Sequence, residues 1–209
     1  MKTAVLVLIA LSAALELHGE LGRQRRLIYL FKPLTTALIT LVALLPPRHS
    51  PASYAVLVGL GLLASLAGDI LLMLPDDRFV PGLASFAAAQ LLYSAAFALR
   101  ARWGLHPEAL VVVAALIALN AVSVVRRAAS LRLPVLAYLV VILTMAYGAY
   151  ACWRTLGGWR PLAAFVGACL FVASDQALAL DRFVRPLRAA PLVIMVAYYA
   201  AQCLIALSV

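Results

Sequence analysis

Residues 54–74 read YAVLVGLGLLASLAGDILLML, an apolar run whose one charged side chain is Asp69. About twenty residues of α-helix cross the roughly 30 Å of hydrocarbon in a bilayer, so a run of this length predicts a membrane-spanning helix. Similar apolar runs cover residues 1–17, 28–45, 82–99, 108–125, 133–153, 161–180 and 191–209. The sequence therefore predicts an all-α, polytopic transmembrane bundle of about eight spans.

The composition supports a membrane protein over a soluble one. Of the 209 residues, 66% are hydrophobic and 12% are charged, whereas soluble domains are about half apolar and about a quarter charged. The net charge of +9 comes from arginines at span ends, a placement that suits anionic lipid headgroups and does not suggest nucleic acid. Because the spans use most of the chain, residues 1–209 are expected to form a single transmembrane domain.

The basic residues are divided unevenly between the two sides of the predicted bundle. The connections after the first, third, fifth and seventh spans carry Arg23, Arg25, Arg26, Arg78, Arg126, Arg127, Arg132, Arg182, Arg185 and Arg188, and the other side carries Lys2, Arg48, Arg100, Arg102, Arg154 and Arg160. The positive-inside rule places the richer side in the cytoplasm and both termini outside. We expect a multi-pass protein of a bacterial inner (plasma) membrane.

The two halves of the chain resemble each other weakly. Residues 69–80 (DILLMLPDDRFV) align loosely with residues 175–184 (DQALALDRFV), and Lys32-Pro33 and Leu133-Pro134 lie near the starts of the second and sixth spans. The pattern predicts two half-repeats, about 1–103 and 104–209, related by an axis along the membrane normal as in other parallel repeats. The alternative is chance similarity between spans rich in leucine and alanine.

Three ionisable residues lie inside the predicted spans. Asp69 and Asp175 each lie about five residues, or about 7 Å, inside the end of a span, and Lys32 lies at a similar depth inside the start of another. The directions of these spans place all three on the cytoplasmic face. Charged groups inside a bilayer are costly unless they meet a partner or water, so we expect them to share a polar pocket. Other polar residues predicted to line this pocket are Gln90, Tyr93, Asn120, Tyr138, Tyr198, Tyr199 and Gln202.

Three interpretations of this pocket follow from the residues alone. Lys32 can form a structural salt bridge with one aspartate, the pocket can couple transport to an ion, or it can catalyse a reaction. Two neighbouring carboxylates repel, so one tends to hold a proton while the other stays ionised near Lys32. Such an acid and base pair suits hydrolysis. The sequence carries no His-x-Glu-x-x-His or phosphate-binding glycine motif, so chemistry without a metal or cofactor is favoured.

Three sequence blocks then resemble a known family. They are residues 31–36 (FKPLTT), residues 68–79 (GDILLMLPDDRF) followed by Gly82, Phe86 and Tyr93, and residues 174–183 (SDQALALDRF) followed by residues 198–205 (YYAAQCLI). In this order, they resemble the YhhN-like integral membrane proteins, the lysoplasmalogenase family, over essentially the whole chain. Gln90 departs from the pattern, because the family is expected to carry histidine at this position. The resemblance therefore does not imply a proton-transfer role for Gln90.

The resemblance implies an ether hydrolase. Its substrates would be lysoplasmalogens, which are alkenyl glycerophosphoethanolamine or glycerophosphocholine lipids, and its products a fatty aldehyde and a glycerophospho-alcohol. Asp69 and Asp175 would supply the acid and the carboxylate, Lys32 would bias which one stays ionised, and the tail would run toward mid-membrane. The alternative is a proton-coupled carrier or a binding protein for a lysolipid or another small amphiphile.

Overall fold

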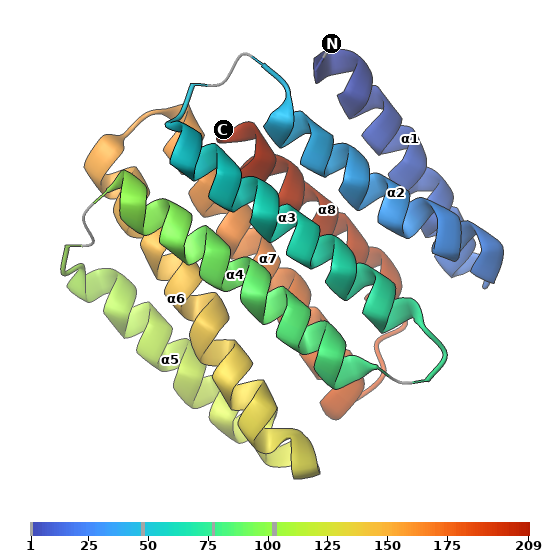
Figure 1. Ribbon diagram of the computed structural model, residues 1–209. Coiled ribbons are helices and arrows are strands. Elements are labelled where there is room, and N and C mark those ends of the chain that lie inside the picture. Colours follow the sequence, from blue (N-terminus) through green and yellow to red (C-terminus); the bar gives the residue numbers. More distant parts are fainter. Residues whose placement is uncertain (1, 47–48, 77, 102–103) are drawn as a thin grey trace.

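The structure is a bundle of eight long helices (Figure 1). This computed structural model describes residues 2–46, 49–76, 78–101 and 104–209. The helices are α1 (Lys2–Leu21), α2 (Arg25–Leu44), α3 (Ala52–Met73), α4 (Phe79–Arg100), α5 (Pro107–Ser123), α6 (Arg132–Leu156), α7 (Trp159–Phe183) and α8 (Ala190–Leu207), with short 3-10 helices η1 (Val125–Arg127) and η2 (Ala129–Leu131) between α5 and α6.

The predicted all-α bundle of eight spans is confirmed. Eight helical segments are long and apolar enough to cross a membrane, and their ends fall within four residues of the predicted ones. No strand occurs in the four described stretches. Arg48 and Arg102 of the charge comparison, and Asp77 of the first half-repeat, lie outside the described residues.

Most sequential helices pack beside each other, except that α4 packs against α6 rather than α5, and α8 takes a central place. The closest pairs are α1 with α2, α3 with α4, and α7 with α8, while α8 also contacts α1, α2 and α3. Both termini lie at the same end of the bundle (Figure 1). The backbone N–H of His49 donates to the Val209 carbonyl over 2.9 Å, so the α2–α3 connection lies at this end too. An even number of membrane crossings requires this arrangement.

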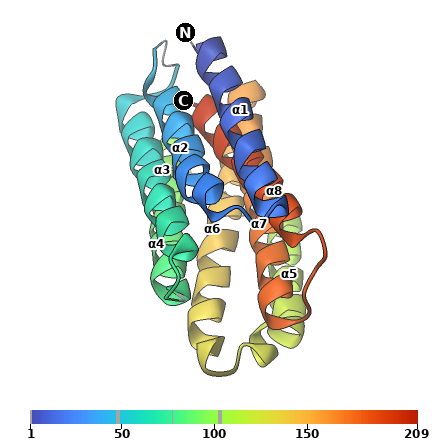
Figure 2. The ribbon, with the colours of Figure 1, turned by 90° about the vertical axis from the view of Figure 1, so that its right-hand side faces the viewer.

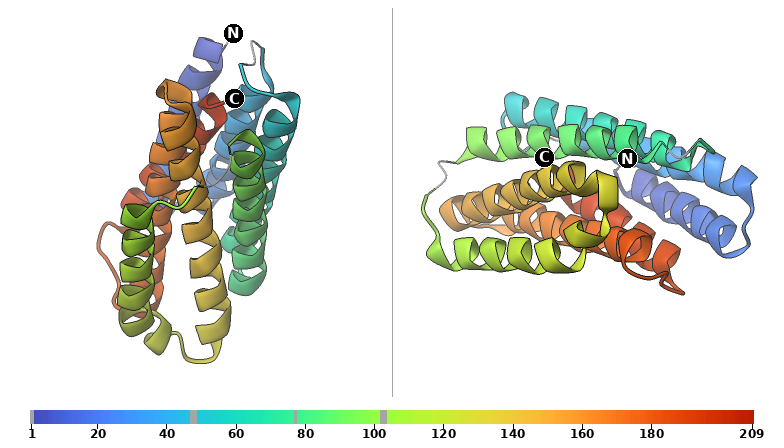
Figure 3. Two further views of the ribbon diagram at one scale, coloured as in Figure 1. Left: turned by 90° about the vertical axis from the view of Figure 1, so that its left-hand side faces the viewer. Right: turned by 90° about the horizontal axis from the view of Figure 1, so that it is seen from below.

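Helix α5 lies at the edge of the bundle, on the outer side of α6 and away from α3 and α4 (Figures 2 and 3). Its main helical neighbour is α6. In the span that contains α5, 11% of the residues are buried, against 28–44% in the other spans. Large side chains such as Val111 and Leu119 are exposed on it, as expected for a helix that faces lipid on most sides.

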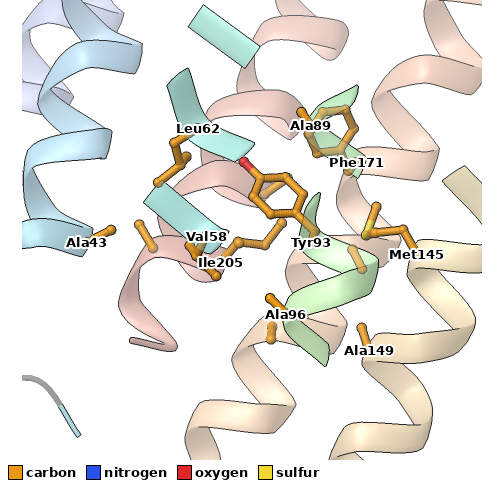
Figure 4. Packing of buried hydrophobic residues seen from close by; sticks show 14 of the residues in the cluster. Ala43, Val58, Leu62, Ala89, Tyr93, Ala96, Met145, Ala149, Phe171 and Ile205 are labelled. Carbon is orange, nitrogen blue, oxygen red and sulfur yellow. The ribbon is translucent and has the colours of Figure 1, made fainter. Parts of the chain in front are cut away.

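The closely packed core holds the helices that carry the polar residues. Tyr93, Phe171 and Met145 are fully buried there, and the ring of Tyr93 extends from α4 toward Leu62 on α3 (Figure 4). Gly61 leaves the space that this ring fills, since a Cβ atom at Gly61 would overlap it. Close helix approach at small residues is typical of membrane bundles, and here it fixes α3 against α4.

Candidate active site

The Asp69 side chain, near the end of α3, is held by hydrogen bonds from two other helices. Its side chain is buried, and its Oδ2 atom accepts two hydrogen bonds, from the Thr36 hydroxyl on α2 over 2.6 Å and from the Tyr198 hydroxyl on α8 over 2.7 Å. Hydrogen bonds to an ionised acceptor are the stronger kind. Helix α2 and the distant helix α8 therefore both hold this carboxyl group of α3.

An aromatic cluster packs beside Asp69. The Phe86 ring from α4 lies against Gly68, where an added Cβ would come within 2.7 Å of its Cε2 atom. The same ring meets Tyr198 edge-on at 5.8 Å and Phe171 at 6.2 Å between centroids. Phe86 thus fills the space between α3 and the α7–α8 pair, and it excludes water from one side of the Asp69 region.

Asp175 lies on α7 in a different setting. Its Oδ2 accepts hydrogen bonds from the Tyr138 hydroxyl on α6 and from Nε2 of Gln90 on α4, the latter over 3.4 Å. Gln90 Nε2 also donates to the Tyr138 oxygen over 2.7 Å. Asp175 therefore has different hydrogen-bond donors from Asp69. Both of its donors, Tyr138 and Gln90, are neutral side chains.

Two small cavities reach Asp175. Each has about 50 Å³ of free space, and both are lined by Asp175 and Tyr138. One extends toward Leu72 and Phe86, and the other toward Asn120 on α5. This volume is enough for water molecules. Asp69 lines neither cavity, so Asp175 is the carboxyl group that a small molecule in them would meet.

Buried polar atoms between the two aspartates lack protein partners. Tyr93 donates to Oε1 of Gln202 over 2.8 Å, but Nε2 of Gln202, Oε1 of Gln90 and the Ser65 hydroxyl have no hydrogen-bond partner in the described part of the protein. Buried polar groups are normally hydrogen-bonded. These atoms therefore mark positions where water or polar groups of a ligand can bind.

Lys32 and Tyr199 lie on the Asp69 side of the site. Lys32 is half-buried on α2 and interacts electrostatically with Asp69 and with Glu16 on α1. Tyr199 follows Tyr198 on α8, and its buried hydroxyl lacks a partner among the described residues. This side of the site therefore contains two carboxyl groups and one ammonium group.

Glu16 also belongs to the site, although its position near a span end suggests the membrane interface. That interpretation is wrong, since Glu16 is 0% exposed and neither carboxyl oxygen has a hydrogen-bond partner in the described structure. The helical spacing carries a signal that could have found it. The buried residues of α1 are Val5, Ile9, Ser12, Glu16 and Gly19, which recur every three or four positions and mark the inward face of a helix.

The remaining predicted residues fall in distinct places. Asn120 is buried on α5, where its side chain donates to the Leu116 carbonyl over 2.9 Å, and it reaches the site through the second cavity. Thr36 was missed, although it lies four residues after Lys32 on the same helical face. Among the described residues, no group of three or more His, Cys, Asp or Glu side chains is placed to hold a metal ion.

Comparison with known proteins identifies relatives over most of the chain. The model of the YhhN family matches residues 27–209. The Bos taurus protein named lysoplasmalogenase TMEM86A is 37% identical over 152 residues, which cover 71% of this chain and 62% of the relative. The Homo sapiens protein named lysoplasmalogenase TMEM86B is 38% identical over 161 residues, covering 74% and 64%. The Escherichia coli membrane protein YhhN is 33% identical over 181 residues, covering 85% and 84%.

The extent of these matches differs between relatives. The chain spans less than two thirds of the length of the bovine and human proteins and most of the bacterial one. No solved structure matches. Helix α1, which carries Glu16, precedes the region matched by the family model.

Proposed function

This chain belongs to the YhhN family, and from that premise we propose that it is a membrane hydrolase that cleaves the vinyl-ether bond of lysoplasmalogens. The names of the mammalian relatives support the reaction and a lysophospholipid substrate. The structural observation that carries the proposal is the placement of Asp175, which lines two cavities and is held by Tyr138 and Gln90. A carboxyl group that faces a cavity large enough for water can serve as the acid and base in cleavage of a vinyl ether.

The reaction begins with proton transfer to carbon. Asp175 donates its proton to the outer alkene carbon of the vinyl ether, and the inner carbon becomes an oxocarbenium ion. Water adds to that carbon and loses its proton to the Asp175 carboxylate. The bond from the hemiacetal carbon to the glycerol oxygen then breaks as the hemiacetal hydroxyl proton passes to that oxygen, which gives a fatty aldehyde and a glycerophospho-alcohol. A single carboxyl group thus serves as acid and then as base, a use typical of general acid/base catalysis.

Asp69 and Lys32 form the charged half of the site. Lys32 interacts electrostatically with Asp69, and Thr36 and Tyr198 donate to the same Asp69 oxygen. Asp175 also accepts two hydrogen bonds, so it is the charge of Lys32 that distinguishes Asp69 and suits a carboxylate that remains anionic. Asp69 lines neither cavity, so we assign it an electrostatic role at a distance: a fixed negative charge in a region of low dielectric favours a cationic intermediate without touching it.

Polar residues around the two aspartates would bind the substrate. Tyrosine faces suit the ammonium of an ethanolamine or choline headgroup, and partnerless amide and hydroxyl groups suit the glycerol and phosphate oxygens. The residues assigned to this role are Gln90, Tyr93, Asn120, Tyr138, Tyr198, Tyr199 and Gln202. The excess of basic residues on the α1–α2, α3–α4, α5–α6 and α7–α8 connections favours a site that faces the cytoplasm of a bacterial inner membrane.

The test uses the purified protein in detergent with two lysolipids that differ at one bond. An alkenyl lysophosphatidylethanolamine should release a fatty aldehyde, and the alkyl analogue with a saturated ether should release none. Mass spectrometry follows the fatty aldehyde and the glycerophospho-alcohol. If the alkenyl lipid stays intact while the protein remains folded, the hydrolase proposal is wrong.

A further inference from the structure

We propose that the apolar groove between α5, α6 and α7 holds the hydrocarbon tail of the lysolipid, with Asp175 at one end and the Glu108–Tyr150 pair at the other. The proposal rests on the hydrolase function above and names the part of the protein that selects the tail. It follows from two adjoining cavities, the length of the groove and the groups at its far end.

The first observation is that two cavities adjoin. The small cavity with Asp175 and Asn120 shares Val172 with a larger cavity of about 400 Å³. The two also lie on successive turns of α5, at Asn120 and Leu116, and on adjacent residues of α6, at Ile142 and Leu143. The two cavities therefore adjoin, in a row that leads away from the Asp175 carboxyl group.

The second observation is the chemistry and position of the larger cavity. Its walls are formed mainly by small and aliphatic side chains, which include Ala109, Val112, Val113, Leu116, Leu143 and Ala146. Because α5 packs mainly against α6 and is little buried, this cavity lies at the edge of the bundle, next to lipid. A single alkyl chain can therefore enter sideways from the membrane without leaving an apolar environment.

The third observation is the length of the groove. Asp175 and Phe165 are ten residues apart on α7, which is about 15 Å at helical rise. The hydrocarbon core of a bilayer is about 30 Å thick and holds two layers of chains, so one lipid chain spans about 15 Å. The groove therefore matches the length of one membrane lipid tail that begins at the reacting bond.

A polar and aromatic cluster lies at the far end of the groove. The Tyr150 hydroxyl donates to Oε1 of Glu108 over 2.8 Å, and Arg154 donates to the Tyr150 oxygen over 2.7 Å. The Phe165 ring stacks on Trp153, with 5.4 Å between centroids and 6° between planes. A tail longer than the groove would have to displace this hydrogen-bonded cluster, so the cluster sets an upper limit to the tail length.

The experiment measures kcat/KM for a series of alkenyl lysolipids with tails of increasing length. Ala146→Phe fills the middle of the groove, so kcat/KM for long tails should fall at least tenfold, while that for the shortest tail should stay within about threefold of wild type. Ala37→Phe is the matched control, since Ala37 lies on the exposed face of α2 and its substitution should leave the length profile unchanged.

A second variant keeps the proposal testable if the Ala146→Phe protein does not fold. Leu116→Ala enlarges the groove and should raise the relative kcat/KM for tails with a methyl branch at least threefold. If Ala146→Phe reduces kcat/KM equally for every tail length, or if neither variant changes the tail profile, the groove does not hold the tail. If wild-type protein releases no aldehyde from any substrate, the hydrolase function fails and this proposal with it.

Discussion

The hydroxyl of Tyr198 donates a hydrogen bond to Oδ2 of Asp69 over 2.7 Å and so joins α8 to α3 inside the bundle. Thr36 donates to the same oxygen from α2. The orientation of the Asp69 carboxylate is therefore fixed from two directions, and each donor can be removed without removing the acid itself.

Loss of the Tyr198 hydroxyl tests this orientation. Tyr198→Phe keeps the ring that packs against Phe86 and removes one of the two donors to Asp69. A hydrogen bond to a charged group contributes about 1.5–3 kcal/mol, so we expect kcat for aldehyde release to fall about tenfold to a hundredfold with little change in KM. Tyr29→Phe, at an exposed tyrosine of α2, is the control. A Tyr198→Phe enzyme with the wild-type kcat would exclude the role given to this bond.

Substitutions of Gln90 test whether the site needs an N–H donor at this position, which a histidine can also supply. Gln90 donates to Tyr138 and Asp175. Gln90→His retains a ring N–H and should keep kcat within about fivefold, whereas Gln90→Leu removes the donor and should lower kcat at least tenfold. Steady-state kinetics of the two purified variants decide between these outcomes. Equal activity of both variants would show that the donor is dispensable.

We expect the buried Glu16 carboxyl group to lower the thermal stability of the protein and to raise its kcat. A buried polar group without a partner costs about 1–3 kcal/mol, so Glu16→Met should raise the thermal midpoint of the purified protein. The same change removes a carboxylate that interacts with Lys32 and should lower kcat about tenfold. Thermal unfolding and aldehyde release are measured on the same sample.

The control for Glu16 is Glu20→Gln, one turn further along α1, where the side chain is half-buried. It should leave both the thermal midpoint and kcat near the wild-type values. A Glu16→Met protein that is less stable than wild type and fully active would refute both expectations.

Gly68 tests the packing of α3 against α4. Gly68→Ala places a Cβ 2.7 Å from the Phe86 ring, and such overpacking costs about 1–3 kcal/mol, so the thermal midpoint should fall. Gly59→Ala on the same helix meets its nearest neighbour, Leu44, at an ordinary 3.5 Å and should be tolerated. Adding Phe86→Leu to Gly68→Ala should recover most of the lost stability, and failure to do so would place the strain elsewhere.

Much of the fold was predictable because the bilayer imposes a length on each span. Apolar runs of about twenty residues identified the eight helices of the described chain. Counting placed Asp69, Asp175 and Lys32 at a similar depth, whereas Asp69 lies four residues before the end of α3, Asp175 eight before the end of α7 and Lys32 seven after the start of α2. The packing partners did not follow from counting. That Thr36 and Tyr198 meet Asp69, while Tyr138 and Gln90 meet Asp175, depends on which helices are neighbours in space.

Glu16 shows the limit of an argument from span ends. Its position five residues before the end of α1 suggests an interfacial side chain, but the rotation of α1 against α2 and α8 turns it inward. The two half-repeats, with four helices in each half, remain a prediction. The sequence pattern supports it through the two Asp-containing segments, which lie near the ends of α3 and α7.

The central claim is that Asp175 carries the hydrolysis, and the rate of aldehyde release by Asp175→Asn tests it most directly. Asparagine keeps the size of the side chain and removes its acid and base functions, so the rate should fall by about 10²–10⁴. The matched variant is Asp181→Asn on the same helix, where Oδ1 accepts from the Leu187 N–H over 2.7 Å and an amide oxygen can still do so. Its rate should equal that of wild type. An Asp175→Asn protein that releases aldehyde at the wild-type rate would contradict the account.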